Sequence, residues 1–159
     1  MKYIAHLLFF LAVTTAKAQV VDYDIQYFFK EQGLSNSTIN DIYQDNDGYI
    51  WIATGKGLNR FDGQEFRIYS KRENGLLTNY ISKIFGDQNN QLWLINYSES
   101  NATVSIFNKK TEKTISFEEY FPNAPFEQKD ISFIDSDKNG ICIVTKQHEV
   151  YLYLSLIHI

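Results

Sequence analysis

The chain has 159 residues and a formal net charge of −4; 44% of its residues are hydrophobic and 16% are aromatic. This composition predicts a packed core within one domain. The acidic balance and the absence of a basic run argue against nucleic acid as a partner of this segment. Cys142 is the single cysteine, so no disulfide within the chain is possible.

Residues 1–18 have the features of a secretory signal peptide. Lys2 supplies a positive start, residues 3–13 are largely apolar, and Ala16-Lys17-Ala18 is a small-residue cleavage site before Gln19. The apolar run is about half the length that a membrane-spanning helix needs, which disfavours an anchor. We therefore expect export, with cleavage before Gln19.

Residues 33–70 predict four short strands joined by turns. Each expected strand is rich in β-branched and aromatic residues, which favour a pleated and partly buried conformation. Asp45-Asn46-Asp47-Gly48 and Asp62-Gly63 are strong turn signals, because Asp and Asn bond their own backbone and Gly accepts a positive φ. The expected strands are residues 38–44, 49–54, 58–61 and 65–69.

The pattern returns twice downstream. Trp93 stands 42 residues after Trp51, and a fainter third copy lies at an offset of 92 residues, with Ile143 where the tryptophan belongs. A period of about 40 to 50 residues with four strands per unit is typical of β-propeller blades. We predict an all-β, incomplete β-propeller of about two and a half to three four-stranded blades.

The expected domain organisation follows from these copies. After the signal peptide, residues 19–32 form a lead-in, whose residues 24–29 are expected to pair with the last blade as a closing strand. A polar bridge over residues 71–74 separates the first two blades, and a second bridge over residues 118–129 carries Phe121 and Phe126 as packing anchors. Residues 155–159 resemble translated adapter sequence, and a genuine terminal strand is the alternative. In either case the chain holds fewer than three complete blades, whereas propellers have four to eight, so we expect a fragment. The expected blades are residues 33–70, residues 75–119 and, in part, residues 130–154.

Two strings in the first copy, residues 45–54 (DNDGYIWIAT) and residues 57–63 (GLNRFDG), resemble the two-component regulator propeller repeat. The consensus of that family is D-x-x-G-x-[IL]-W-[IV]-G-T followed by G-L-x-x-[FY]-D. The first copy departs from it at Ala53, and the second lacks the turn glycine, having Asn90 instead.

This resemblance implies that the chain is an N-terminal fragment of the periplasmic sensor of a hybrid histidine kinase. The sensor would be the exported part of an inner-membrane protein and would respond to a glycan breakdown product. The implied partners are an oligosaccharide, the remaining blades and the downstream domains, and the full-length parent would be a dimer that carries the kinase.

No catalytic, cofactor-binding or metal-binding residue can be assigned. Residues 135–140 match the first six positions of a calcium loop, but position twelve is Lys146 and not the required carboxylate, so a polar turn is expected. Trp51 and Trp93 are interpreted as packing between blades, and Cys142 as a small core residue in a buried strand. The polar insertion at residues 96–103 is the candidate ligand loop, although the ligand-contacting residues stay unassigned.

A second class of function remains open. A secreted propeller lectin or polysaccharide-acting enzyme would also carry these repeats. It would need a carboxylate cluster in the central channel or a terminal secretion domain. We expect no enzymatic activity from this chain itself.

Overall fold

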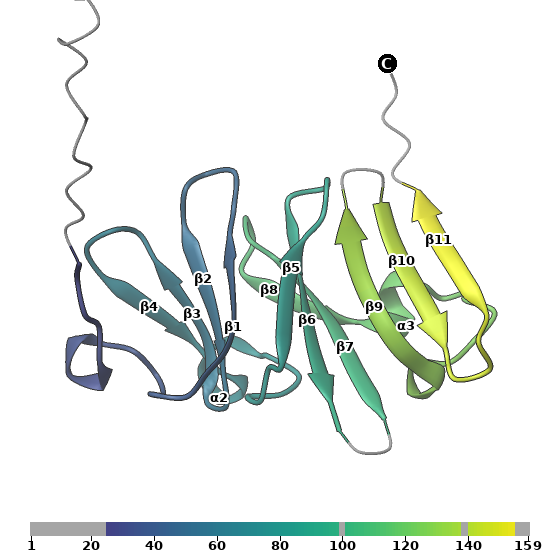
Figure 1. Cartoon of the computed structure of the whole chain (residues 1–159), viewed down its shortest axis with the longest axis horizontal. Coiled ribbons are helices and arrows are strands. Elements are labelled where there is room, and N and C mark those ends of the chain that lie inside the picture. The colour runs from purple at the N-terminus through teal and green to yellow at the C-terminus, as the bar shows by residue number, and fades with distance from the viewer. Residues whose placement is uncertain (1–24, 99–100, 138–139, 155–159) are drawn as a thin grey trace, which may run out of the picture.

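The structure is a computed structural model that describes residues 25–98, 101–137 and 140–154, and antiparallel sheets dominate it (Figure 1). The predicted signal peptide and the tail at residues 155–159 lie outside the described residues. Three sheets follow one another along the chain, and we call them blades 1, 2 and 3. Blade 1 contains β1 (Ile39–Gln44), β2 (Ile50–Thr54), β3 (Gly57–Phe61) and β4 (Phe66–Tyr69). Blade 2 contains β5 (Lys83–Gly86), β6 (Gln91–Tyr97), β7 (Ala102–Asn108) and β8 (Lys113–Ser116). Blade 3 contains β9 (Ile131–Asp137), β10 (Gly140–Thr145) and β11 (Val150–Leu154).

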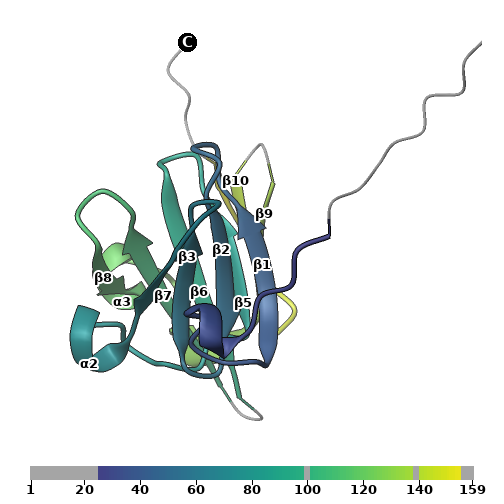
Figure 2. The same ribbon diagram turned by 90° about the vertical axis from the view of Figure 1, so that its left-hand side faces the viewer.

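The blades stand side by side with their faces packed together. The first strands β1, β5 and β9 lie on one side of the molecule, and β8 lies on the opposite side (Figures 1 and 2). Within each blade every strand pairs with the next one along the chain. This arrangement confirms the predicted all-β fold of propeller blades, with four strands in each of the first two and three described strands in the third.

Short helical segments connect the sheets. The segment expected as a polar bridge, α2 (Lys71–Asn74), is a helical turn whose N-cap Ser70 accepts a hydrogen bond from the Glu73 amide. α3 (Phe117–Tyr120) and η2 (Gln128–Asp130) lie between blades 2 and 3, and η1 (Lys30–Gln32) precedes blade 1. None of the helices in the described ranges is long and apolar enough to cross a membrane.

Blade 2 is buried on both faces, because the alternation of its strands sends apolar side chains to both neighbours. Leu92, Leu94 and Phe107 pack against Trp51 and Tyr69 of blade 1 in one apolar cluster. A second cluster joins the opposite face of blade 2 to blade 3 through the side chains of Trp93, Ile95, Ile106, Ile134, Ile141 and Ile143.

The predicted pairing of residues 24–29 with the last blade of a closed propeller stays a prediction, because the described residues form three sheets and no closed ring. Residues 25–29 form no strand and are exposed, while Asp24 lies outside the described residues. A strand needs a backbone partner, and this segment finds none among the described residues. Its Phe28 ring packs instead on blade 1, 4.7 Å from the ring centroid of Phe61 and 5.5 Å from that of Phe66.

The structure also corrects the position of the missing tryptophan in blade 3. Trp51 pairs across the sheet with Tyr43, and Trp93 pairs with Phe85. The residue with this pairing in blade 3 is Cys142, opposite Asp135, and not Ile143. The cause is a shorter turn. The pair Gln44 and Ile50 encloses residues 45–49, whereas the corresponding pair Ser136 and Ile141 encloses only residues 137–140.

The register determines which way Cys142 faces. Ile141 and Ile143 point into the core shared with blade 2, so Cys142 between them points to the other face of blade 3. The thiol is free and its residue is half-buried, which corrects the expectation of a buried core residue.

Candidate functional site

The same hydrogen-bonded arrangement occurs in two turns, the one between β1 and β2 of blade 1 and the one between β5 and β6 of blade 2. Asp45 Oδ1 accepts bonds from the amides of Asp47 and Tyr49, both at 3.0 Å, and its Oδ2 accepts the indole N–H of Trp51 at 2.8 Å. Asp87 repeats this arrangement, and its Oδ2 accepts the indole N–H of Trp93 at 3.0 Å. One carboxylate therefore both shapes the turn and orients the tryptophan.

Both tryptophans are buried, which agrees with their interpretation as packing residues. The Trp51 ring lies 5.8 Å from the rings of both Tyr69 and Phe107, so it joins blade 1 to blade 2. The Trp93 ring contacts Tyr120, which follows β8. Neither indole offers an open face on which a sugar could stack.

A buried ion pair crosses from blade 2 to blade 1. Lys109 Nζ lies 2.7 Å from Asp45 Oδ2 and 3.4 Å from Asp47 Oδ2. Only 8% of the Lys109 side chain and 1% of the Asp45 side chain are exposed. Burial alone raises the pKa of Asp45, but the hydrogen bonds from Lys109 and Trp51 more than offset it and lower the pKa below its usual range.

A second inter-blade contact centres on Glu112 in the turn between β7 and β8. Its carboxylate accepts hydrogen bonds from the Arg67 guanidinium and from the Tyr69 hydroxyl, the latter at 3.0 Å. It also lies 4.0 Å from the Arg60 guanidinium. Burial, with a smaller effect of the Glu112 acceptor, raises the pKa of Tyr69 to about 12. Glu112 adopts φ 55°, a left-handed conformation that is uncommon outside glycine, and these contacts hold it there.

The calcium-like turn of blade 3 has a structural partner. Asp135 Oδ2 lies 2.7 Å from Lys83 Nζ of blade 2, and the same ammonium group donates to the Ile134 carbonyl at 3.2 Å. Within residues 25–98, 101–137 and 140–154, no three acidic, histidine or cysteine side chains are placed to hold a metal ion. Asp135 therefore links two blades.

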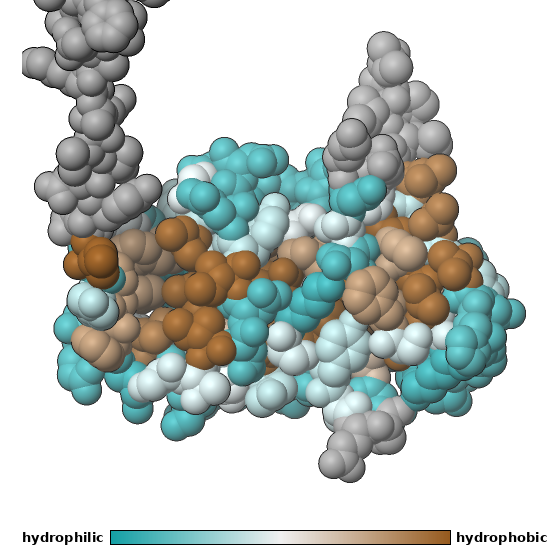
Figure 3. Space-filling view, in the orientation of Figure 1, coloured by the Kyte–Doolittle hydropathy of each residue, from teal (hydrophilic) through white to brown (hydrophobic). Residues whose placement is uncertain are grey.

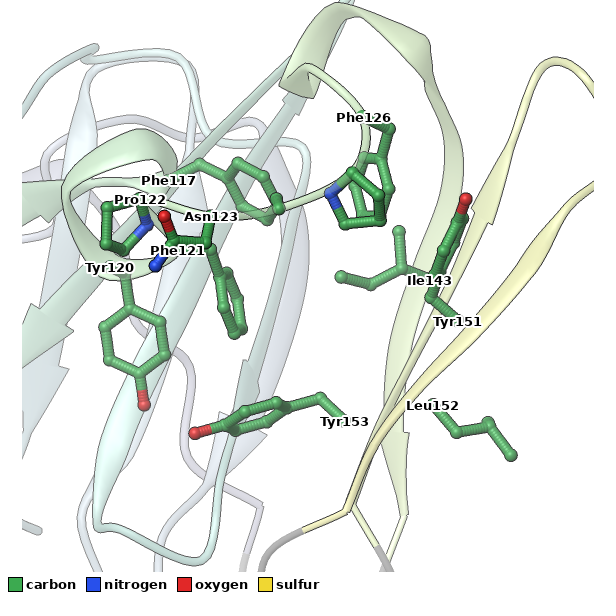
Figure 4. A pocket seen from close by; sticks show the side chains of 12 residues that line it. Phe117, Tyr120, Phe121, Pro122, Asn123, Phe126, Ile143, Tyr151, Leu152 and Tyr153 are labelled. Carbon is green, nitrogen blue, oxygen red and sulfur yellow. The ribbon is translucent and has the colours of Figure 1, made fainter.

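An uncharged aromatic groove of about 370 Å³ lies between blade 3 and the connection that follows α3 (Figure 4). The Phe121 ring faces Tyr153 with centroids 4.9 Å apart, and Phe126 faces Tyr151 at 4.5 Å. Asn123 and the tyrosine hydroxyls add polar groups among otherwise apolar walls. We call this the aromatic groove. Its lining residues are Phe117, Tyr120, Phe121, Pro122, Asn123, Ala124, Pro125, Phe126, Ile143, Tyr151, Leu152 and Tyr153.

The chemistry of the aromatic groove is that of a neutral binding surface. Burial raises the pKa of Tyr120, so its hydroxyl stays protonated at neutral pH. The Tyr151 hydroxyl donates a hydrogen bond to Glu149 at 3.0 Å. This hydrogen bond raises the pKa of Tyr151, so its hydroxyl also stays protonated at neutral pH. A groove of aromatic rings with a few hydroxyl and amide groups suits a neutral ligand that has both apolar faces and polar edges.

The sequence predicted a different ligand site, the polar insertion between two strands of the second blade. Residues 96–103 were expected as a polar loop, but Asn96 pairs with Thr103 and Tyr97 pairs with Ala102 in a long β6–β7 hairpin. Tyr97 turns inward, and its hydroxyl oxygen accepts the Ile134 amide at 3.1 Å. The aromatic groove was missed, although Phe121 and Phe126 were expected as anchors; the run FEEYFPNAPF is its sequence signal.

The comparisons with known proteins agree with the repeat. The family described as "Two component regulator propeller" matches residues 33–56. A protein named histidine kinase P4, from Formosa agariphila, is 45% identical over 60 residues. That match covers 38% of this chain and 4% of the relative.

Solved structures resemble a larger part of the chain. The extracellular domain of a protein described as a hybrid two component system of B. thetaiotaomicron is 26% identical, with a TM-score of 0.57. The match covers 81% of this chain and 20% of that domain. The extracellular domain of another such system from the same organism is 22% identical, with a TM-score of 0.51. The match covers 89% of this chain and 19% of that domain. The second likeness bears on the fold alone. This chain thus spans about a fifth of the solved domains that it resembles.

Proposed function

The chain carries a repeat of the two-component regulator propeller family, and from this premise we propose that it forms part of the ligand-sensing propeller of an extracytoplasmic sensor. The observation that carries the proposal is the coincidence of two matches. The repeat in blade 1 matches the family, and the packed blades resemble the extracellular domain of a hybrid two component system.

Export is the first element of this proposal. Residues 1–18 would direct the chain across the inner membrane and would be removed before Gln19, which agrees with the extracellular setting of the solved relatives. Amino-terminal sequencing of protein recovered from the periplasm should begin at Gln19 or within a residue or two of it. Recovery of intact Met1 from that compartment would contradict the proposal.

The second element is the ligand, which we propose is a neutral oligosaccharide bound in the aromatic groove. Sugar rings present apolar C–H faces and polar hydroxyl edges, and the groove offers aromatic rings, tyrosine hydroxyls and the Asn123 amide. No charged side chain lines it, so an anionic saccharide would have no counter-charge there.

A binding measurement with two matched variants tests this ligand. The probe is a set of purified neutral oligosaccharides from cell-wall polysaccharide digests, added to the full chain in a calorimeter. Tyr151→Ala should abolish the binding heat, because it removes a ring of the groove. Tyr80→Ala removes an exposed ring outside the groove and should leave binding unchanged. Equal loss in both variants, or no binding to the unmodified chain, would refute this ligand.

The output is the third element. We propose that the full-length parent is a dimer that couples the propeller to a histidine kinase, which is the activity named for the relative from Formosa agariphila. In the full-length protein, the oligosaccharide that binds the groove should change the rate of kinase autophosphorylation. Release of shortened sugars without any phosphorylation would favour the secreted polysaccharide-acting enzyme.

A further inference from the structure

The connections before blades 2 and 3 are built alike but differ in composition. The connection of residues 70–82 begins with α2, that of residues 117–130 begins with α3, and a serine caps each helical turn. The first contains no proline, whereas the second has two prolines and four aromatic residues in the run FEEYFPNAPF. Polar side chains cover the turns at the upper ends of blades 1 and 2 in Figure 3, so this aromatic connection is an exception. Binding residues are found disproportionately on such surface connections.

Blade 2 holds this connection in place. The buried Phe117 ring lies 5.1 Å from the ring centroid of Phe121 and 5.9 Å from that of Phe126. Phe121 also packs on Trp93 of β6 at 5.9 Å. The Phe121 carbonyl accepts the Ala124 amide at 3.1 Å, which closes a turn around residues 122 and 123. This wall of the aromatic groove is therefore fixed by a blade whose four strands the structure describes.

Asn123 is the polar group of the groove that stays available to a ligand. The Tyr151 hydroxyl already donates to Glu149 at 3.0 Å. The hydroxyls of Tyr120 and Tyr153 interact with each other and lie near one another in Figure 4. The exposed amide of Asn123 lines the groove and has no hydrogen-bond partner among the described residues.

We propose that Asn123 determines which neutral sugars the aromatic groove accepts, by binding two neighbouring hydroxyl groups of one sugar unit. This inference rests on the oligosaccharide ligand proposed above. An asparagine amide has a carbonyl acceptor and an NH₂ donor on one planar group. The carbonyl oxygen accepts the O–H of one hydroxyl, and the N–H donates to the oxygen of the next. The aromatic rings contact the apolar faces of many sugars, whereas a group that binds a ligand hydroxyl discriminates against a ligand that lacks it.

Calorimetry of the full chain tests this role. The probes are the neutral oligosaccharides of the binding measurement above and analogues of each that lack single hydroxyl groups. In the unmodified chain, loss of either of two adjacent hydroxyls should weaken binding by about tenfold. Asn123→Ala should weaken binding of the parent oligosaccharide by at least about tenfold and should no longer distinguish it from those two analogues. The matched control Asn101→Ala removes an exposed amide outside the groove and should leave all affinities unchanged.

The outcomes separate this inference from the proposed ligand. If Asn123→Ala weakens the parent oligosaccharide and every analogue equally, Asn123 has a structural role and the proposal is overturned. Unchanged affinity of Asn123→Ala would overturn it as well. In both cases the loss of binding in Tyr151→Ala would still identify the groove as the binding site. Absence of binding to the unmodified chain would refute the oligosaccharide ligand, and this inference with it.

Discussion

Gly86 is glycine because a ring from the neighbouring blade occupies the space that a side chain would need. A Cβ at this position would lie 2.1 Å from the Tyr43 hydroxyl oxygen and 2.5 Å from its Cζ. Gly86→Ala must therefore push the Tyr43 ring out of its packing and should lower the free energy of unfolding by about 1–3 kcal/mol. Chemical denaturation measures this change.

Two variants separate the clash at Gly86 from a general effect of replacing glycine. Gly55→Ala meets nothing closer than the Asn36 amide nitrogen at 3.4 Å, so it should change stability little. In a Tyr43→Leu background the ring is absent, and Gly86→Ala should then cost much less. An equal cost in both backgrounds would show that Tyr43 is not the cause.

Lys109 is the second residue whose role depends on a neighbouring blade. Lys109→Met keeps most of the side chain but removes the ammonium group from the buried Asp45 carboxylate. Breaking a buried pair on one side leaves an uncompensated charge, so we expect a loss of about 3 kcal/mol in the free energy of unfolding. The control Lys110→Met changes the adjacent exposed lysine and should be nearly neutral. Similar losses in both variants would contradict the buried-pair explanation.

The same contact predicts a pH dependence. The pKa of Asp45 is lower in the folded chain than its unfolded value of about 3.9, so its contribution to stability is present above that value. The contribution is lost as the pH falls through the lower folded pKa. The stability difference between the unmodified chain and Asp45→Asn should therefore shrink on acidification below about pH 4. Denaturation curves at several pH values would measure this difference, and a difference that grows in acid would refute the sign.

At the scale of the element, the register of β10 decides which side chains reach the core. The offset of 92 residues from Trp51 places Ile143 at the tryptophan position, whereas the strand pairing places Cys142 there. The two registers place the Cys142 side chain on opposite faces of blade 3, because a shift of one residue moves every side chain of a strand to the other face of the sheet. Thiol accessibility can tell them apart.

Under native conditions, Cys142 should react with a thiol reagent many times faster than a cysteine at the next position. The comparison variant is Cys142→Ser with Ile143→Cys, whose thiol would lie in the core between blades 2 and 3. Both proteins should react at the same rate once unfolded in denaturant, which controls for intrinsic reactivity. A protected Cys142 beside a reactive cysteine at 143 would favour the offset of 92 residues.

At the scale of the whole molecule, the blades should differ in stability. Blade 2 packs on both faces, whereas each of its neighbours packs on one described blade. Hydrogen exchange should accordingly be slowest for the amides of β6 and β7, and faster for those of β2, β3 and β10. Mass spectrometry of exchanged peptides measures this order. Equal protection of the three blades would mean that they unfold as one unit.

The sequence by itself determined the local features of this protein. Alternating apolar residues and Asp-Gly turns were enough to predict the strands of blade 1, because these signals act between residues close in the chain. The recurrence of this pattern at offsets of 42 and 92 residues predicted the propeller class. Burial of Trp51 and Trp93 was also predictable from their recurrence inside apolar strands. In each case the information lies in a local pattern or in its repetition along the chain.

Only the tertiary structure decided the features that join distant residues. Asp45 and Lys109 are 64 positions apart, and nothing in the sequence of either turn marks the other as its partner. The aromatic groove needs β11 to return against the connection after α3, and the position of Cys142 depends on a turn that is one residue shorter. Repeat offsets indicate how far apart the strands lie in the sequence, but packing between blades determines which side chains are in contact. The reason is that the apolar side chains of a strand face the neighbouring blade in only one register.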